Sequence, residues 1–244
     1  MPEGPSIVIL RELADKFKGQ TVLRAEGNTR QIDLSLLEFE VVTDIKSWGK
    51  HFLICFAGFT VRIHFLLYGS SLIDMEKSTP VRLALHFANG TIRFFACSVR
   101  LITDPLDEVY DWSADVLSPA WNPRLAVEKL LDRPEMTAGD SLLDQDIFAG
   151  CGNIIRNEVL FRIRVHPESL IGKLPPGKLR ALVREAVDYS KDFLAWKKAF
   201  VLRKHFCVYR KSVCPRDGVL LMNRKLGKYA RRSYYCPFCQ RIYI

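Results

Sequence analysis

The first half of the chain changes from a helical pattern to an alternating one. Within residues 6–17, apolar residues recur at the three- and four-residue spacing of an amphipathic helix. From residue 21 to residue 103, short runs alternate apolar and polar positions, and residues 81–95 hold two such runs around an Asn-Gly turn. Several short strands separated by turns predict a β-sandwich or barrel, with the leading helix packed against it.

The second half is mainly helical in pattern. Residues 104–123 are acidic and contain prolines, which is typical of a linker between domains. Beyond them, apolar spacing predicts a helix over 141–148, with Ser141 as its cap and Asp144 in the first turn. The other predicted helices cover residues 123–131, 153–164 and 178–196.

Bulk composition is that of a folded soluble protein, with 48% hydrophobic and 26% charged residues in 244. Apolar runs stay well below the ~20 residues that span a membrane, and the first residues do not follow a signal-peptide pattern. Seven cysteines in this context predict reduced thiols, and a metal site, in preference to disulfides.

The positive charge is concentrated in the last fifth of the chain. Residues 197–244 hold 13 lysines and arginines and one acid, Asp217, and so carry a formal charge of +12. The whole chain carries +9, so residues 1–196 together carry 9 − 12 = −3. Aromatic residues are interleaved with these cations. A basic, aromatic segment favours nucleic acid as the partner over a merely solvated surface.

The first residues suggest a reaction centre. Aminopeptidases remove Met1 when the next side chain is small, which would leave a free secondary amine on Pro2 beside the Glu3 carboxylate. An α-amine has a pKa of roughly 8 against about 10.4 for lysine, so its neutral fraction at pH 7 is about a hundred-fold larger. The alternative is a disordered start. Lys50 follows a glycine at the start of a predicted strand, where it is either a surface lysine or a ligand for a phosphate or a reacting centre.

Two further segments are candidates for DNA contact. Leu66, Leu67 and Tyr68 end a predicted strand before a glycine, and they are either core or an apolar wedge for a base stack. The Gly-Cys-Gly turn before Asn153 leads into a helix N-terminus, where Asn153 would add a cap and a donor for a phosphate. An ordinary packing turn is the alternative.

A metal site is predicted near the C-terminus. Cys214, Asp217, Cys236 and Cys239 have the spacing of a zinc ribbon on a β-hairpin, with a carboxylate in place of one thiolate. Cys207 is an alternative fourth ligand, and a hairpin held by packing without metal is a further one.

Together these residues resemble the formamidopyrimidine-DNA glycosylase / endonuclease VIII family over essentially the whole chain. The similar segments are residues 1–5, Gly49-Lys50, residues 143–145, 149–153, 157–161 and 231–240. The resemblance implies an α+β fold: an N-terminal helix plus β-sandwich domain, then a helical helix–two-turn–helix domain with a C-terminal zinc-finger-like β-hairpin. The expected domains are residues 1–112, 118–200 and 201–244.

The resemblance also implies a base-excision-repair DNA glycosylase with AP lyase activity. Pro2 would attack C1′ of a damaged nucleotide, Glu3 would move protons around the sugar, and Lys50 would bind a phosphate or help to protonate the leaving base. The cationic iminium on Pro2 would permit β- and δ-elimination. The residues implied in DNA binding are Asn153 and Arg231 as phosphate clamps, and Leu66, Leu67 and Tyr68 as the filler of the vacated stack.

Three departures from the family pattern shape the expectation. Ser6 stands where the family usually has a second glutamate, and Asp217 replaces a finger cysteine. The segment between the 178–196 helix and a strand expected to begin at Phe206 is short, so it leaves little room for a loop over 8-oxoguanine. The short segment favours oxidised pyrimidines, or a broad specificity that tolerates single strands, over 8-oxoguanine. The alternatives are a non-catalytic DNA-binding relative and an RNA-binding zinc-ribbon protein.

We expect structural Zn²⁺ and no catalytic metal. The expected partner is damaged double-stranded DNA, with single-stranded DNA as an alternative, and no membrane. A monomer in the cytoplasm, associated with the nucleoid, is expected.

Overall fold

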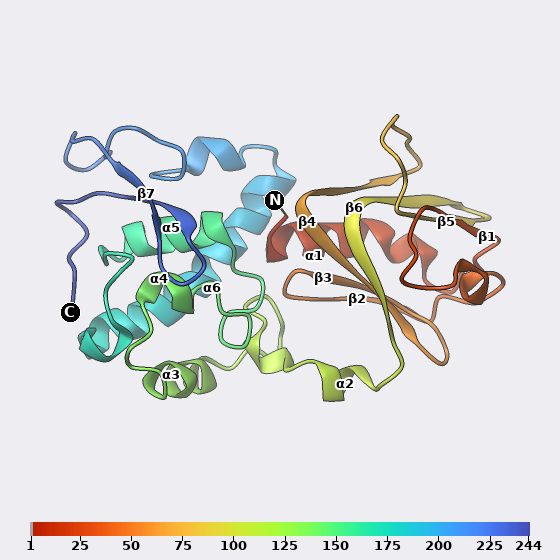
Figure 1. Ribbon diagram of the computed structural model, residues 1–244, viewed down its shortest axis with the longest axis horizontal. Coiled ribbons are helices and arrows are strands. Elements are labelled where there is room, and N and C mark those ends of the chain that lie inside the picture. The colour runs from red at the N-terminus through yellow and green to blue at the C-terminus, as the bar shows by residue number, and fades with distance from the viewer. Residues whose placement is uncertain (1) are drawn as a thin grey trace. The chain divides into compact units, whose positions relative to one another are not determined.

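The computed structural model describes residues 2–244, and its chain divides into two compact units, residues 1–110 and 111–244. Met1, whose removal the first residues predict, lies outside the described residues. In Figure 1 the first unit runs from red to yellow-green and holds α1 and the long strands; the second runs from green to blue. Every helix within residues 2–244 is too short or too polar to traverse a lipid bilayer.

The first unit opens with α1 (Gly4–Ala14), which begins two residues before the predicted start. Pro5 lies in the first turn, where its fixed φ suits a helix and its missing N–H is not needed. The strands and the short helix that follow are β1 (Arg24–Glu26), β2 (Asp44–Trp48), β3 (His51–Cys55), β4 (Thr60–Ile73), β5 (Leu83–Phe87), β6 (Gly90–Ile102) and α2 (Leu106–Val109).

The six strands form one antiparallel ladder in the order β1-β5-β6-β4-β3-β2. β4 and β6 are the two long strands, so the ladder folds over with β1 and β5 along one part of them and β2 and β3 along another (Figure 1). Buried residues from β2 to β6 share one core with the apolar face of α1. The predicted β-sandwich with a packed helix is confirmed, as is the hairpin, in which Phe87 pairs with Gly90.

The second unit is built on helices around a separate core. Its helices are α3 (Pro123–Leu131), α4 (Ala138–Ser141), α5 (Asn153–Arg162) and α6 (Pro176–Lys198), and its strands are β7 (Met222–Leu226) and β8 (Arg231–Tyr235). Short 3₁₀ helices cover Asp15–Phe17, Leu34–Leu37, Trp112–Ala114, Ile171–Lys173 and Leu202–His205 in the two units. The helices predicted at 123–131, 153–164 and 178–196 are confirmed, and each buries apolar residues at helical spacing.

The helix predicted over 141–148 is wrong. The helix at this point is α4, and its N-cap is Thr137, whose hydroxyl accepts from the Asp140 amide at 3.1 Å. α4 ends at Ser141, whose hydroxyl donates to the Ala138 carbonyl at 3.0 Å instead of capping a new helix. The chain then turns until α5 begins, which gives the predicted helix–two-turn–helix arrangement. Phe206, expected to begin a strand, follows the 3₁₀ helix Leu202–His205 without extended pairing.

Candidate active site and nucleic-acid interface

Pro2 and Glu3 are held at the start of α1. The Glu3 carbonyl accepts from the amides of Ser6 at 2.8 Å and Ile7 at 3.3 Å, and Glu3 is the N-cap residue of the helix. Only 1% of the Glu3 surface is exposed, whereas Pro2 is half-buried. These contacts favour the ordered start over the disordered alternative, and the buried Glu3 directly follows Pro2 in the chain.

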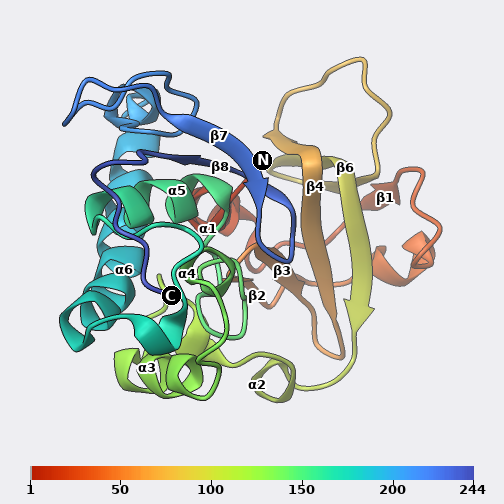
Figure 2. The same ribbon diagram turned by 60° about the vertical axis from the view of Figure 1, so that its left-hand side comes forward.

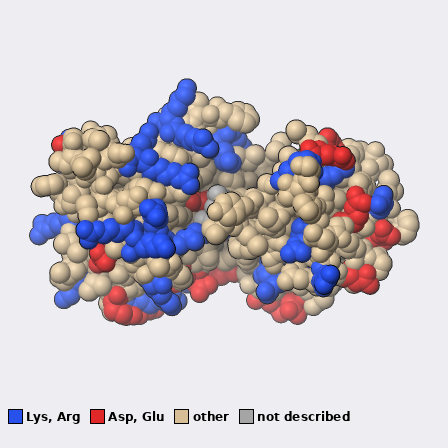
Figure 3. Space-filling model, turned by 45° about the horizontal axis from the view of Figure 1, so that its top comes forward, with Lys and Arg blue, Asp and Glu red and all other residues tan. Residues whose placement is uncertain are grey.

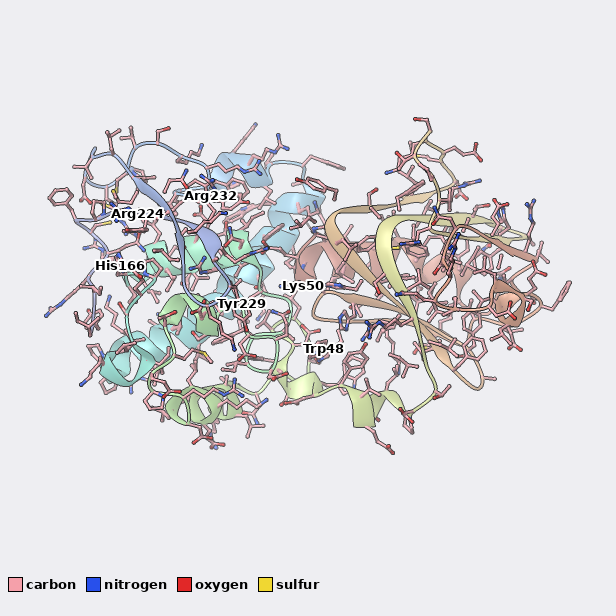
Figure 4. The ribbon with its side chains drawn as sticks, in the orientation of Figure 1. Trp48, Lys50, His166, Arg224, Tyr229 and Arg232 are labelled. Atoms are coloured by element: carbon pink, nitrogen blue, oxygen red, sulfur yellow. The ribbon has the colours of Figure 1, made fainter. Side chains whose placement is uncertain are left out.

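Lys50 lies in the turn between β2 and β3. The preceding Gly49 has φ +53°, a left-handed conformation that glycine adopts at little cost. Figure 4 shows Trp48 and Lys50 at this end of the two strands. α1, whose N-cap residue is Glu3, packs against both β2 and β3. The same two strands are joined by the turn that holds Lys50.

Two imidazoles, which the sequence did not single out, border Lys50. His51 Nδ1 lies 3.1 Å from the Tyr110 hydroxyl, and the His51 and His64 rings meet edge to face at 5.2 Å. Burial first, and then the positive charges of Arg62, His64 and Lys50, lower the pKa of His51 to about 3. Burial and Lys50 also lower the pKa of His64. Both rings are therefore neutral near pH 7, and only the strand register, which pairs His51 with His64, brings them together.

The Leu66–Tyr68 segment is exposed and is not part of the core. Pairing of β4 with β6 jumps from Phe65 to Ser70, so four residues of β4 face one residue of β6. Such a bulge turns side chains out of the sheet. Leu66, Leu67 and Tyr68 are 51%, 54% and 90% exposed. Gly69 is required there, since a Cβ would lie 2.8 Å from the Ala96 carbonyl oxygen and 2.9 Å from Phe65.

Asn153 begins α5, but its side chain is not the cap that the sequence suggested. The N-cap is Gly152, and the cap has no side-chain hydrogen bond. Instead, Asn153 Nδ2 donates to the Arg232 carbonyl at 2.9 Å, and Arg156 donates to Asn153 Oδ1 at 3.2 Å. The Asn153 side chain is thus used in joining α5 to β8.

Two buried polar residues of α5, for which the sequence suggested no role, position the hairpin of β7 and β8 and the chain leading to it. Asn157 Oδ1 accepts from the Tyr234 amide at 2.6 Å. Glu158, with 0% of its surface exposed, accepts from three consecutive amides, at 2.9, 3.0 and 2.7 Å. These amides belong to Cys207, Val208 and Tyr209. Figure 2 shows the hairpin lying along α5, as these bonds require.

Lysines and arginines gather on one face of the second unit. On the face that Figure 3 shows, they outnumber the acids of this unit, whereas the first unit mixes both signs. The hairpin contributes Arg224, Lys225, Lys228, Arg231 and Arg232, of which Arg224 and Arg232 are labelled in Figure 4. Beneath it, Arg156 is 1% exposed; burial, and secondarily the charge of Arg231, lowers its pKa to about 10, against the opposing effect of Asp140. Asn153 and Arg231 therefore lie in one basic region, and their role as phosphate clamps stays a prediction.

The four predicted metal ligands come together. One ligand atom from each of Cys214, Asp217, Cys236 and Cys239 lies within 4.8 Å of the others. The Cys214 and Cys239 sulfurs are 3.9 Å apart, and Asp217 Oδ2 lies 3.5 Å from Cys214 Sγ and 3.0 Å from Cys236 Sγ. Zinc bonds of about 2.3 Å to sulfur and 2.0 Å to oxygen give tetrahedral S···S and S···O separations of about 3.8 and 3.5 Å.

The donor set therefore fits a tetrahedral metal, and Asp217 is preferred to Cys207. Cys207 lies outside the four-residue cluster, and its amide binds Glu158. In the protonated state, burial first raises the pKa of Cys236 to about 12, and the hydrogen bond from Cys236 lowers the pKa of Asp217. A bound cation would displace the thiol protons, so its binding releases protons and stabilises the folded hairpin.

Two family models match this chain in succession. Residues 1–101 match the formamidopyrimidine-DNA glycosylase N-terminal domain, and residues 113–201 match the formamidopyrimidine-DNA glycosylase H2TH domain. Endonuclease 8-like 3 of Homo sapiens is 29% identical over 88% of this chain and 37% of its own length. The DNA-(apurinic or apyrimidinic site) lyase Nei2 of Mycolicibacterium smegmatis is 27% identical over 98% of this chain and 99% of its own length.

A solved structure of a formamidopyrimidine-DNA glycosylase has the same fold. The crystal structure of Lactococcus lactis formamidopyrimidine-DNA glycosylase, bound to DNA containing an AP site, superposes with a TM-score of 0.85 at 21% identity, over 98% of this chain and 99% of the other. The chain spans less than half the length of the endonuclease 8-like 3 proteins that it matches. With both domain models matched in order along one chain, this protein belongs to the formamidopyrimidine-DNA glycosylase / endonuclease VIII family.

Proposed function

We propose that this protein is a bifunctional DNA glycosylase and AP lyase that removes oxidised bases from DNA, with pyrimidines favoured. The observation that carries the proposal is the ordered start of α1, where the buried Glu3 directly follows Pro2 in the chain. An amine nucleophile beside an acid/base group is what Schiff-base chemistry at a sugar carbon needs. The relative from M. smegmatis, named a lyase, supports the same activity.

The proposed reaction begins when the lone pair of the neutral Pro2 amine attacks C1′. The bond from C1′ to the base breaks, and the base leaves with that electron pair and takes up a proton. Glu3 moves protons at the sugar ring as it opens to the iminium, and Lys50 binds a backbone phosphate or supplies the proton to the base. Loss of a C2′ proton then expels the 3′ phosphate, and loss of a C4′ proton expels the 5′ phosphate.

In this proposal DNA is held through its phosphates and its vacated base stack. Asn153 and Arg231, which share one basic region, clamp phosphates beside the extruded nucleotide. The exposed Leu66, Leu67 and Tyr68 fill the gap that the nucleotide leaves. Zinc on the Cys214 cluster stiffens the hairpin that carries Arg231 and takes no part in the chemistry.

The preference for pyrimidines is proposed from the chain after α6. Only residues 199–205 separate the end of α6 from Phe206, and Glu158 then fixes the next three amides. A segment this short, tied at both ends, has little length to fold over a large purine lesion.

Borohydride trapping tests the activity. Protein confirmed by mass spectrometry to begin at Pro2 is incubated with duplex DNA containing an abasic site or thymine glycol, and then reduced. A covalent adduct is expected, and the Pro2→Gly variant, which keeps an amine of lower nucleophilicity, should give less. Retained Met1 makes the Pro2 nitrogen an amide, so unprocessed protein is the matched negative control. No adduct with processed protein would refute the proposal.

A non-catalytic DNA-binding relative is the second candidate, and Ser6 favours it. Ser6 lies in the first turn of α1, close in sequence to Glu3, at the position where the resemblance implies a second carboxylate. This candidate predicts salt-sensitive binding to abasic DNA without an adduct. Restoring the carboxylate with Ser6→Glu should then create trapping activity that the natural chain lacks.

A further inference from the structure

The end of α6 is closed by an unusual residue. The Val201 amide donates to the Trp196 carbonyl at 2.9 Å and the Phe200 amide to the Lys197 carbonyl at 3.1 Å, the paired bonds of a Schellman motif. This motif needs a left-handed residue just past the helix, and glycine usually supplies it. Here the residue is Phe200, with φ +59°. A side chain in this conformation is strained by about 1 kcal/mol or more relative to glycine.

Packing does not offset this strain. Phe200 is 96% exposed, so its ring buries almost no surface within the unit. Strain that the fold does not need, on a fully exposed aromatic ring, points to a role outside the fold.

The surroundings of Phe200 define what it can bind. Four cations, Lys197, Lys198, Arg203 and Lys204, lie within four residues of it, and residues 193–216 contain no acid. Lys198, Arg203 and Lys204 are exposed. A bare ring among cations suits a ligand with both a flat apolar face and negative charge, which is the chemistry of a nucleotide.

We propose that Phe200 is a stacking platform for an unpaired base of single-stranded DNA, whose phosphates are held by the lysines and arginine around it. The proposal rests on the proposed function in that it takes DNA as the ligand. It adds a contact that duplex DNA cannot use, because paired bases are already stacked. Stacking of one base on an aromatic side chain contributes about 1–3 kcal/mol.

The chain offers a matched control in its other unit. Phe39 is also exposed, at 77%, and also left-handed, with φ +68°. Its neighbours are Glu38 and Glu40, which repel phosphate. Phe39 thus shares the strain and the exposure of Phe200 but not its charge environment, and a change there reports on strain alone.

The test is binding of the full-length protein to a fluorescently labelled oligothymidylate at several salt concentrations. Phe200→Gly should bind about 5- to 150-fold more weakly, with an unchanged salt slope, because the ring displaces no counterions. Phe200→Trp should bind at least as well as the natural chain. Lys204→Ala should lower the salt slope instead. Both Phe200→Gly and Phe39→Gly should raise the melting temperature by a few degrees through relief of strain.

The outcomes separate cleanly. Oligothymidylate affinity of Phe200→Gly within twofold of the natural chain would overturn the proposal, as would an equal loss of affinity in Phe39→Gly. An equal loss of binding to polyglutamate would also overturn it, since it would indicate an acidic protein as the ligand. Trapping on duplex abasic DNA is read in parallel: an adduct with no effect of Phe200→Gly refutes this inference alone, and no adduct refutes the proposed function alone.

Discussion

Glu158 provides the sharpest test of how the interface is built. Its buried carboxylate is the acceptor for the amides of Cys207, Val208 and Tyr209, two on Oε1 and one on Oε2. In Glu158→Gln the amide oxygen can replace Oε1, but an NH₂ group then faces the Cys207 amide. One charge-assisted hydrogen bond is lost, two others weaken, and two donors oppose each other. Hydrogen bonds to charged groups contribute about 1.5–3 kcal/mol each, so a loss of about 2–4 kcal/mol is expected.

The loss should be local, because the three amides begin the segment that leads to the metal ligands. Hydrogen exchange read by mass spectrometry on a peptide covering residues 206–214 measures it directly. Exchange there should be about 30- to 1,000-fold faster in Glu158→Gln, while peptides of the first unit are unchanged. Glu128→Gln, an exposed change on α3, is the control. Exchange within threefold of the natural chain would refute the role assigned to Glu158.

Three other changes have defined outcomes. Asp217→Ala leaves three thiolates and should lower zinc affinity at least about tenfold in competition with a chromogenic chelator, whereas Asp217→Cys should raise it; equal affinities would contradict the four-ligand site. Because the pKa of His51 is about 3 in the folded chain, only the unfolded chain binds this proton between about pH 3 and 6.5. The contribution of His51 to the free energy of unfolding is therefore fully present above about pH 6.5 and is lost as the pH falls toward 3. His51→Gln should therefore remove up to about 1.4 kcal/mol per pH unit from the pH dependence of urea unfolding, and an unchanged dependence would argue against a buried neutral imidazole. Gly227→Ala should weaken DNA binding, because the added Cβ would lie 2.2 Å from Asp140 Oδ1. Gly218→Ala should retain DNA binding, since Gly218 has a similar φ (+68° against +73°) but no atom within 4 Å of the added Cβ. Equal effects of the two changes would assign the loss to backbone strain.

Elements with long periodic patterns were predictable from sequence, and the short ones were not. α3, α5 and α6 each repeat an apolar face over several turns, so the period identifies them. α4 is four residues long, and its capping pair, Thr137 and Asp140, competes in the sequence with the similar pair at Ser141 and Asp144. A local rule cannot choose between two caps when neither is followed by a long apolar repeat.

The residues of the candidate site also differ in whether the sequence alone could predict their position. The metal ligands were predictable, because their spacing follows from the local geometry of a hairpin. The exposure of Leu66–Tyr68 was not, because it depends on a bulge that exists only through pairing with β6. Asn153 was assigned a local capping role, but its partner is the Arg232 carbonyl, 79 residues away. Glu158 has the same character, since a charged residue on a helix is ordinarily expected to face solvent.

The hairpin is held on α5 by polar anchors more than by apolar packing. Its buried apolar cluster is small and includes two of the metal ligands themselves, Cys214 and Cys236. A core of this size does not stabilise some 40 residues without a metal or a cross-link. The side chains of Asn157, Glu158 and Asp140 therefore set where the hairpin lies, and the metal sets whether it is folded.

This division of labour predicts how the two losses differ. Without metal the hairpin should unfold while α5 and its neighbours keep their core, because that core contains none of the metal ligands. With metal but without an anchor, the hairpin should stay folded and lose its fixed position on α5. In the proposed function both changes displace Arg231 and weaken DNA binding. Only the first should abolish the exchange protection of β7 and β8 themselves, which distinguishes an unfolded hairpin from a misplaced one.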